Sequence, residues 1–426
     1  MRWMMGILAL VVAVPAAAQQ MEVTLQDAVQ RALQVQPAMI QARGDQRNAS
    51  AGMLATNGEY LPTLQGNGSY GRAGGTRLNS QTNQIITAPA TTTFQGSVSA
   101  SLELFDGFRR FADRGSAGAT SDAADAGLVN QQFQVVLATK QLFYDALARE
   151  ELVRVAQSQV RRAQQQLQIS VDKLHAGSAT RSDSLRSTVD YGNARIALLE
   201  AQANLATAQA NLGRQIGVDH SVRAIPDSIF PALPDTASLR ATALERAPQV
   251  QQAEAQARVA RAQVAVNRAS YFPSITGSLG NSYSGSVAPW TTTSGYSNGW
   301  SAGITLRWTL FNGFTRERQM TTARVARDVA EARAADTRRQ VNAQVTQQLA
   351  ALATTYEQIS IAHDNLAAAT EDLRVQNERY RVGAATILDL LTSQSALTQA
   401  EVNVVQTRFN YLIARAQVEA VLGRTL

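Results

Sequence analysis

Two stretches of this chain alternate strictly between apolar and polar residues and then change abruptly into helical sequence. The clearer one is Trp300–Phe314, WSAGITLRWTLFNGF, which closes on Phe-Asn-Gly-Phe. The other is Phe94–Phe108, which alternates in the same way and closes on Phe-Asp-Gly-Phe. A strand of about ten residues, apolar on one face and small or polar on the other, is the unit of a transmembrane β-barrel. Each stretch therefore predicts a membrane strand.

The sequence after each motif predicts a very long helix. From Gly107 to Gly177 and from Gly313 to Gly383 the chain runs 70 residues (177 − 107 and 383 − 313). At about 1.5 Å per residue, each span is about 100 Å of helix. Ala, Gln, Leu and Val recur at heptad-like spacing and large apolar residues are few, which favours slender coiled-coil packing over a globular core.

The chain is a tandem duplication. Phe-Asp-Gly-Phe at 105–108 returns as Phe-Asn-Gly-Phe at 311–314. His-Ala-Gly-Ser-Ala-Thr at 175–180 returns as Arg-Val-Gly-Ala-Ala-Thr at 381–386. Both pairs have the same offset of 206 residues (311 − 105 and 383 − 177). Tyr-x-Pro and a Leu-rich helical segment recur as well. We therefore expect a signal peptide at 1–18, a first repeat at 19–217, a Pro-rich linker at 218–237 and a second repeat at 238–426.

Each repeat predicts the order helix, strand, strand, long helix, tight turn and helix. The first helix covers roughly 24–58 and bends or breaks at Pro37. We expect strands at about 61–72, 93–105, 273–284 and 299–311, with irregular polar loops at roughly 73–92 and up to 298. The tight turns are expected at 175–183 and 380–389, between the long helix and the returning one.

Composition excludes several classes of protein. The chain has no cysteine, three scattered histidines and a formal charge of +6 that is spread among acids along the helices. We expect no nucleic-acid partner, no metal site, no cofactor and no catalytic site. The matches to G-x-G-x-x-G at 66–71 and G-x-S-x-G at 295–299 lie in or before strands, where neither motif works. Beyond the signal, no segment reaches the eighteen apolar residues of a membrane helix.

Four membrane strands cannot close a barrel by themselves. An open sheet edge in lipid leaves backbone groups unpaired, at several kcal/mol each. Two copies would give eight strands, whose interior is filled by side chains, whereas three copies would give twelve strands and leave a lumen. The sequence therefore predicts a homotrimer in contact with outer-membrane lipid.

The duplicated order of these motifs resembles the outer-membrane factor (TolC-like) family over about residues 20–426. The motifs are Tyr-x-Pro opening a strand, Leu-Phe-Asp/Asn-Gly-Phe closing one, and Tyr-Arg-Val-Gly-Ala-Ala-Thr at 380–386. The resemblance implies a mostly α protein with a membrane β-barrel portion: a trimeric 12-stranded β-barrel continued by a long α-helical barrel in the periplasm. It also implies docking with a periplasmic adaptor (membrane fusion) protein and an inner-membrane transporter.

The resemblance and the residues together give three sets of candidate site residues. The barrel-to-helix hinges are Phe105, Gly107, Phe108, Phe311, Gly313 and Phe314. The candidate adaptor-docking residues at the tips are Ala176, Gly177, Thr180, Val382, Gly383 and Thr386. The candidate periplasmic gate consists of Asp389, Asp183, Tyr380 and Thr392.

The two aspartates of the gate set have two interpretations. Thr180 and Thr386 each precede an acid by three residues, which predicts a capping box at the start of the returning helix. The resemblance implies that Asp389 projects into a closed lumen, where three copies would form an acidic ring that attracts cations. Both interpretations can hold at once.

The sequence departs from the family pattern at two gate positions. A second acidic ring would fall at Thr392, and a locking arginine would fall at Ala385. We therefore expect a weaker lock, or one built with Arg181 or Arg381, in which Tyr380 hydrogen-bonds towards Ser182 or Asp183 of a neighbouring hairpin. Trp290, Trp300 and Trp308 are expected in the lipid face and its aromatic girdle.

The predicted function is a passive outer-membrane exit duct of a tripartite efflux pump or type I secretion system in a Gram-negative bacterium. A stand-alone diffusion porin is a weaker alternative, because porins lack such long helices. The alternative from another class is a soluble or peripheral periplasmic coiled-coil scaffold.

Overall fold

The computed structural model of the protein describes residues 21–426 apart from 82, 227–229, 237, 241–245 and 287–294. The expected signal peptide and Trp290 lie outside the described residues. Within the described part of the chain, no helix is both long enough and apolar enough to span a membrane.

The two halves of the chain repeat one order of elements, as the sequence predicts. The first half contains β1 (Met21–Val23), α1 (Leu25–Val35), α2 (Pro37–Gly58), β2 (Thr63–Asn79), β3 (Gln84–Phe105), α3 (Arg109–His175) and α4 (Arg181–Gln215). The second contains β4 (Val222–Ala224), α6 (Pro248–Arg268), η1 (Ala269–Tyr271), β5 (Ser274–Gly285), β6 (Tyr296–Arg307), α7 (Thr315–Arg381) and α8 (Ile387–Leu422). Both long helices have 67 residues. The break at Pro37 is confirmed, with Gln36 in extended conformation before it.

The chain forms two compact units, and neither corresponds to one sequence repeat. One unit consists of residues up to 40, 131–244 and 342–426, and the other of 41–130 and 245–341. Each unit therefore takes segments from both repeats. The second unit contains the sheet and the helix ends next to it, and the first contains the tips.

The sheet has four antiparallel strands in the order β2-β3-β5-β6. The register places one row across all four strands, with Tyr70 opposite Phe94, Phe94 opposite Gly285 and Gly285 opposite Tyr296. Three of its four members are aromatic, and the fourth is a glycine. Opposite residues share a face, so the pairing separates two faces. The apolar face contains Leu64, Tyr70, Phe94, Val98, Leu102, Leu279, Trp300, Ile304 and Leu306. The other face is mainly Ser, Thr, Asn, Gln and Gly, with Glu103 and Arg307 at one end.

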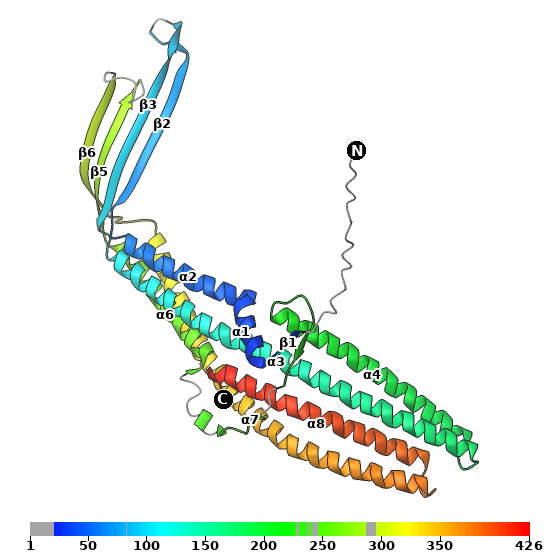
Figure 1. Cartoon of the computed structure of the whole chain (residues 1–426). Coiled ribbons are helices and arrows are strands. Elements are labelled where there is room, and N and C mark those ends of the chain that lie inside the picture. Colours follow the sequence, from blue (N-terminus) through cyan, green and yellow to red (C-terminus); the bar gives the residue numbers. More distant parts are fainter. Residues whose placement is uncertain (1–20, 82, 227–229, 237, 241–245, 287–294) are drawn as a thin grey trace, which may run out of the picture. The chain divides into compact units, whose positions relative to one another are not determined.

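The structure corrects two strand predictions. The segment 73–92 is not an irregular loop, because β2 and β3 pair from Thr63 out to Asn79 and Gln84. The resulting ribbon extends beyond the ends of β5 and β6 (Figure 1). Thr, Ile and Leu in this polar-looking stretch supply the strand propensity that its missing periodicity concealed. In addition, β6 runs from Tyr296 to Arg307 rather than over 299–311.

The helical unit consists of two hairpins, α3/α4 and α7/α8, whose turns lie at the same end (Figure 1). Its core is built mainly from small and medium-sized apolar side chains with a few aromatic rings, including Ala146, Ala208, Leu212 and Phe143. A buried polar layer interrupts the first hairpin, where the hydroxyls of Ser170 and Ser187 lie 2.8 Å apart. Such layers weaken a coiled coil and fix its register.

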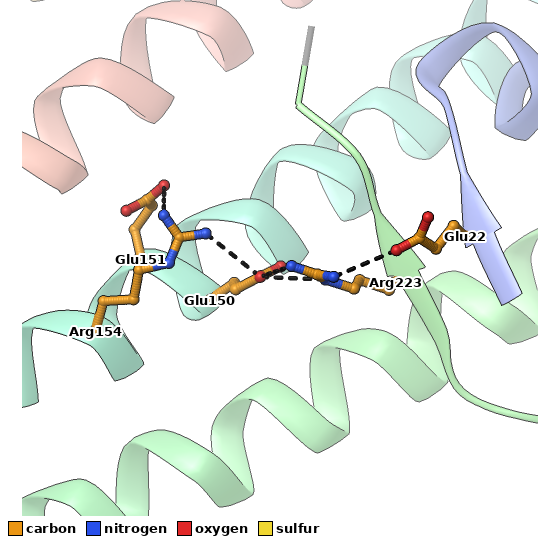
Figure 2. Close-up of polar contacts among 5 residues, drawn as sticks. All are labelled: Glu22, Glu150, Glu151, Arg154 and Arg223. Atoms are coloured by element: carbon orange, nitrogen blue, oxygen red, sulfur yellow. Dashed lines mark hydrogen bonds and ion pairs between the residues drawn. The ribbon is translucent and has the colours of Figure 1, made fainter. Parts of the chain in front are cut away.

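Two short strands were not expected from the sequence. β1 and β4 pair in parallel, with Met21 opposite Val222, so part of the predicted linker is a strand. Arg223 of β4 contacts Glu150 of α3 at 2.7 Å and Glu22 of β1 at 3.3 Å (Figure 2). Burial acts to raise the pKa of Glu150, but hydrogen bonds and charge from Arg223 and Arg154 outweigh it and lower that pKa. Three-residue strands carry too little pattern to be recognised from sequence.

The Arg223 bridge predicts a pH-dependent contribution to stability. Because the pKa of Glu150 is lowered from 4.5, the bridge stabilises the fold above that pH and is lost as pH falls through the lower folded value. We expect Arg223→Met to cost about 1 kcal/mol at neutral pH. The difference from the parent protein should shrink in unfolding measurements below the ordinary pKa of glutamate.

Arg339→Met is the matched control. Among the described residues, the ion pair that Arg339 makes is with the exposed Asp336 of its own helix, at 3.0 Å. It should leave stability unchanged at every pH. A difference for Arg223→Met that stayed constant down to pH 3 would contradict the role of the charge on Glu150.

Candidate functional site: hinges and tips

The hinge motif begins each long helix with a side-chain cap. Asp106 accepts hydrogen bonds from the backbone N–H groups of Arg109 at 3.1 Å and Arg110 at 2.9 Å. In the second repeat, Asn312 accepts one from the N–H of Arg316 at 3.4 Å. Free N–H groups at a helix start need such acceptors, which explains why the second motif residue is Asp or Asn.

The last two residues of each hinge motif adopt left-handed backbone conformations. The φ angles are +70° at Gly107 and +66° at Phe108, and +64° at Gly313 and +61° at Phe314. For phenylalanine this region costs about 1–2 kcal/mol. Perpendicular ring contacts accompany the strain: Phe108 packs 5.4 Å from Phe105, and Phe314 packs 5.5 Å from Phe311, between ring centroids.

An arginine completes each hinge, and the sequence analysis missed it. Arg110 donates to the carbonyl of Leu104 and lies 5.0 Å over the ring of Tyr60. Arg316 donates to the carbonyl of Thr309 and lies 4.3 Å over the ring of Tyr271. The two arginines share the offset of 206 (316 − 110), a signal that could have revealed them.

The tips contain the two predicted capping boxes. The Thr180 hydroxyl accepts from the N–H of Asp183, whose carboxylate accepts from the N–H of Thr180 at 2.9 Å. Thr386 and Asp389 repeat this arrangement, also with 2.9 Å for the second bond. Capping is therefore confirmed. Hydrogen bonds from the Thr386 N–H and hydroxyl lower the pKa of Asp389, so this exposed carboxylate stays ionised.

The other tip candidates are surface residues of the turns. Gly177 and Gly383 have φ angles of +70° and +82°, which suit glycine after a helix end. The exposed candidates are Ala176, Gly177, Thr180, Val382, Gly383 and Thr386. Val382 is an apolar side chain with 68% of its surface exposed. Thr392 is also exposed and hydrogen-bonds the carbonyl of Leu388 in its own helix.

Tyr380 is buried, unlike the other gate candidates. It packs with Leu373, Ile387, Leu390 and Leu397, and its hydroxyl has no hydrogen-bond partner among the described residues. Within the chain it therefore does not make the expected bond to Ser182 or Asp183. The ammonium of Lys173, on α3, lies 3.9 Å from the centre of the Tyr380 ring and donates to the Tyr380 carbonyl at 2.6 Å.

Within the single chain, Arg381 does not join the two hairpins. Arg381 pairs with Glu378 of its own helix at 2.9 Å, and Arg379 donates to the carbonyl of Ala384 in its own turn. Lys173 makes the contact between the α3/α4 and α7/α8 tips instead. Sequence reasoning missed this lysine because its partners are a ring and a carbonyl, which carry no charge pattern.

No metal site accompanies these features in the described ranges, where no cluster of three or more His, Asp or Glu side chains could hold an ion. The candidate site is thus a set of hinges and turns. Each is repeated in both halves.

The family model of the outer membrane efflux protein matches residues 28–218 and 239–424. The chain belongs to the outer membrane efflux protein family. The match falls on both repeats and stops at the linker, so the duplication seen in the sequence is a property of the family.

Two curated relatives agree with this assignment. Protein CyaE of Bordetella pertussis is 27% identical over 388 residues, which cover 88% of this chain and 78% of CyaE. The pyoverdine export outer membrane protein OpmQ of Pseudomonas aeruginosa is 29% identical over 395 residues, covering 88% and 80% of the two chains.

The fold matches outer-membrane channels of known structure. The CusC structure superposes with a TM-score of 0.80 at 18% identity, covering 94% of this chain and 92% of that one. The Campylobacter jejuni CmeC outer membrane channel superposes with a TM-score of 0.80 at 16% identity, covering 94% and 85%. The predicted mostly α fold with a β-barrel portion is confirmed.

This outer membrane efflux protein is therefore an outer-membrane exit duct with a helical portion in the periplasm. The predicted location and duct function are confirmed, and the periplasmic scaffold is set aside. The hinges lie where the strands of the membrane sheet become helices.

The two hinge glycines of this efflux protein should differ in their tolerance of a side chain. A Cβ on Gly107 would lie 2.7 Å from both the Ala269 carbonyl oxygen and the Phe272 Cβ, whereas one on Gly313 would meet nothing within 4 Å. Gly313→Ala should cost about 1–2 kcal/mol through backbone strain alone. Gly107→Ala adds overpacking, for a total of about 2–5 kcal/mol.

Thermal unfolding of the two purified variants measures this difference, with the parent protein as reference. Equal losses for the two alanines would contradict the close approach of Ala269 and Phe272 to Gly107.

Proposed function

We propose that three copies of this chain form a passive duct that docks through its tips with a periplasmic adaptor and an inner-membrane transporter, in a tripartite efflux pump or type I secretion system. The open sheet carries this proposal. Its edge strands β2 and β6 have no further partner among the described residues. In lipid each unpaired backbone group costs several kcal/mol, so the sheet must close with other copies.

Three copies are favoured over two by the width of the barrel. Eight strands leave an interior that side chains fill, whereas twelve leave an open lumen. The proposed role is passive conduction, with the energy supplied by the transporter. One relative supports a role in export, because OpmQ is named for pyoverdine export.

Mass measurement of the detergent-solubilised protein tests the assembly. Three copies in one particle and recovery in the outer-membrane fraction are expected. Recovery in the periplasm without detergent, or a monomer in mild detergent, would sink the proposal.

The exposed turns support the proposal of adaptor docking. Val382 projects from one tip with most of its surface exposed, and Ala176 occupies the corresponding place in the other. Small residues follow each of them, Gly-Ala-Ala after Val382 and Gly-Ser-Ala after Ala176. An exposed apolar side chain next to small residues suits a contact with another protein.

The gate proposal assigns Asp389 a charge that acts across the threefold axis. Its carboxylate is exposed and held ionised by Thr386. Asp183 forms the same capping box in the other hairpin. Asp183 and Asp389 make the same capping contacts, so comparing variants of the two distinguishes a capping role from a role in the lumen.

Asp389→Asn should lower the preference of reconstituted channels for cations, because the acidic ring loses its charge while the amide oxygen still accepts the cap bond. The reversal potential in a potassium chloride gradient measures this preference. Asp183→Asn is the control and should change it less. Equal effects of the two variants would leave Asp389 with a capping role only.

We propose that Lys173 clamps the two tips together, in place of the locking arginine that would be expected at Ala385. Its ammonium holds both the ring and the carbonyl of Tyr380. Lys173→Met keeps the length of the side chain and removes the charge. We expect a loss of about 1–2 kcal/mol from the closed tip, or roughly a tenfold shift towards open channels.

The fraction of time that single reconstituted channels stay open measures that shift. Arg381→Met is the control, because Arg381 pairs only within its own helix. Lys173→Met channels that open no more often than the control would contradict the clamp.

A further inference from the structure

A cavity of about 490 Å³ lies between the long helix α3, the returning helix α8 and the linker that follows β4. Its polar side chains come from both helices: Lys140, Tyr144 and Glu151 of α3, and Arg408, Arg415 and Glu419 of α8. Small-molecule sites in proteins have volumes of about 300–1,000 Å³ and commonly lie between helices. This cavity, called the α3–α8 pocket below, has the size and the place of such a site.

The linker wall of the α3–α8 pocket is fixed to α8. Phe230 and Pro231 form this wall. The hydroxyl of Tyr411 donates to the carbonyl of Pro231 at 3.1 Å, and the Tyr411 ring lies 5.3 Å from that of Phe230. These contacts hold the apolar wall in place within the single chain, so a ligand would not have to order it.

Both acids of the α3–α8 pocket already have cationic partners. Glu419 is 93% buried (100 − 7), and it pairs with Lys140 and, at 3.6 Å, with Arg415. Glu151 pairs at 3.0 Å with Arg154, which is not among the residues that line the pocket. The negative charges of the pocket are therefore compensated.

One cation of the pocket has no such compensation. Arg408 makes no ion pair within the part of the chain that the structure describes. Its guanidinium lies 5.8 Å from the ring centre of Phe230 and 5.8 Å from that of Phe409. A guanidinium binds a carboxylate through two parallel hydrogen bonds, and aromatic rings pack against flat apolar groups. The two features lie side by side here.

The other repeat shows that a returning helix does not need these side chains. At the offset of 206, α4 has uncharged and small residues in the places of the charges and the ring of α8. Arg408 corresponds to Gln202, Phe409 to Ala203, Arg415 to Gln209 and Glu419 to Gly213. Since α4 forms the same kind of hairpin with α3 without these groups, the pairing of helices does not explain their presence in α8.

On these grounds we propose that the α3–α8 pocket binds a small aromatic carboxylate, whose anionic group pairs with Arg408 and whose ring packs between Phe230 and Phe409. The site lies within one chain, so it does not depend on the proposed trimer, and it is a binding function in addition to conduction. The uncompensated charge selects an anion, and the rings select a flat apolar body.

Calorimetric titration of the purified full-length protein in an uncharged detergent tests the site. Naphthalene-2-carboxylate is the probe, and naphthalene-2-carboxamide is its matched analogue with the same ring system and no charge. Detergent without protein gives the blank for both compounds. The carboxylate should bind saturably, with one molecule per chain, and roughly tenfold more tightly than the carboxamide, because the carboxamide cannot form the charged pair with Arg408.

Two variants locate the binding within the chain. Arg408→Gln introduces the residue that the other repeat has at this place, and it should weaken binding of the carboxylate roughly tenfold with little effect on the carboxamide. Phe230→Ala should weaken both compounds by similar factors, because it removes part of the apolar wall. Arg195→Gln is the control for charge: Arg195 is exposed, lies 5.7 Å over the ring of Tyr191 on α4 and is not part of the pocket. It should leave both affinities unchanged.

Three results would overturn the site: no saturable binding of the carboxylate, equal affinities for the carboxylate and the carboxamide, or equal losses in Arg408→Gln and Arg195→Gln. The comparison of the two compounds uses the parent protein, so it does not depend on how any variant folds. A trimeric protein that fails to bind would overturn the site and leave the proposed duct. A monomeric protein that binds would overturn the trimer and leave the site.

Discussion

The unpaired backbone at the edges of the four-stranded sheet is the constraint on which the rest of this protein depends. A row of free N–H and C=O groups in lipid costs more than the net stability of most domains, because each group costs several kcal/mol. The strands alone therefore have no stable state in the membrane. In the proposed trimer the apolar face lies against lipid and each free edge pairs with another copy, so association is part of folding.

The second constraint is the change of backbone at each hinge. The chain leaves a strand, whose side chains alternate, and enters a helix with 3.6 residues per turn after three residues at the first hinge (109 − 105 − 1) and seven at the second (315 − 307 − 1). Gly107 and Phe108 achieve this with two consecutive left-handed residues, and Gly313 and Phe314 do the same. The strain at phenylalanine is offset by the cap on the helix start, by the arginine that binds the preceding carbonyl and by the perpendicular ring pair. All three supports are present in both repeats.

The sequence predicted those features that repeat over many residues or recur at one offset. Alternation identified β6, the spacing of Gly107 and Gly177 identified a 67-residue helix, and Thr180 with Asp183 identified a capping box. It missed features whose partners are distant and uncharged. Lys173 contacts a ring and a carbonyl of Tyr380, and β1 pairs with β4 over only three residues. The ribbon at 73–92 was taken for a loop because Thr, Gly and Asn alternate in no apolar pattern, although β2 and β3 pair out to Asn79 and Gln84 with one register shift between Ala73 and Gly75.

Duplication sets the symmetry of the duct, and divergence between the repeats at the tips breaks it. At the offset of 206, Lys173 corresponds to Arg379, Ser170 to Gln376 and Ser187 to Ser393. In the first hairpin the serine layer is fully paired. In the second, the Gln376 side-chain oxygen and the Tyr380 hydroxyl are both buried without a partner among the described residues, one turn apart. Unpaired buried polar atoms cost about 1–3 kcal/mol each. The α7/α8 tip is therefore held in place at a cost that the α3/α4 tip does not bear, and an arrangement that exposed Gln376 and Tyr380 to water would recover part of it. In the proposed trimer, three hairpins bear this cost and the other three do not.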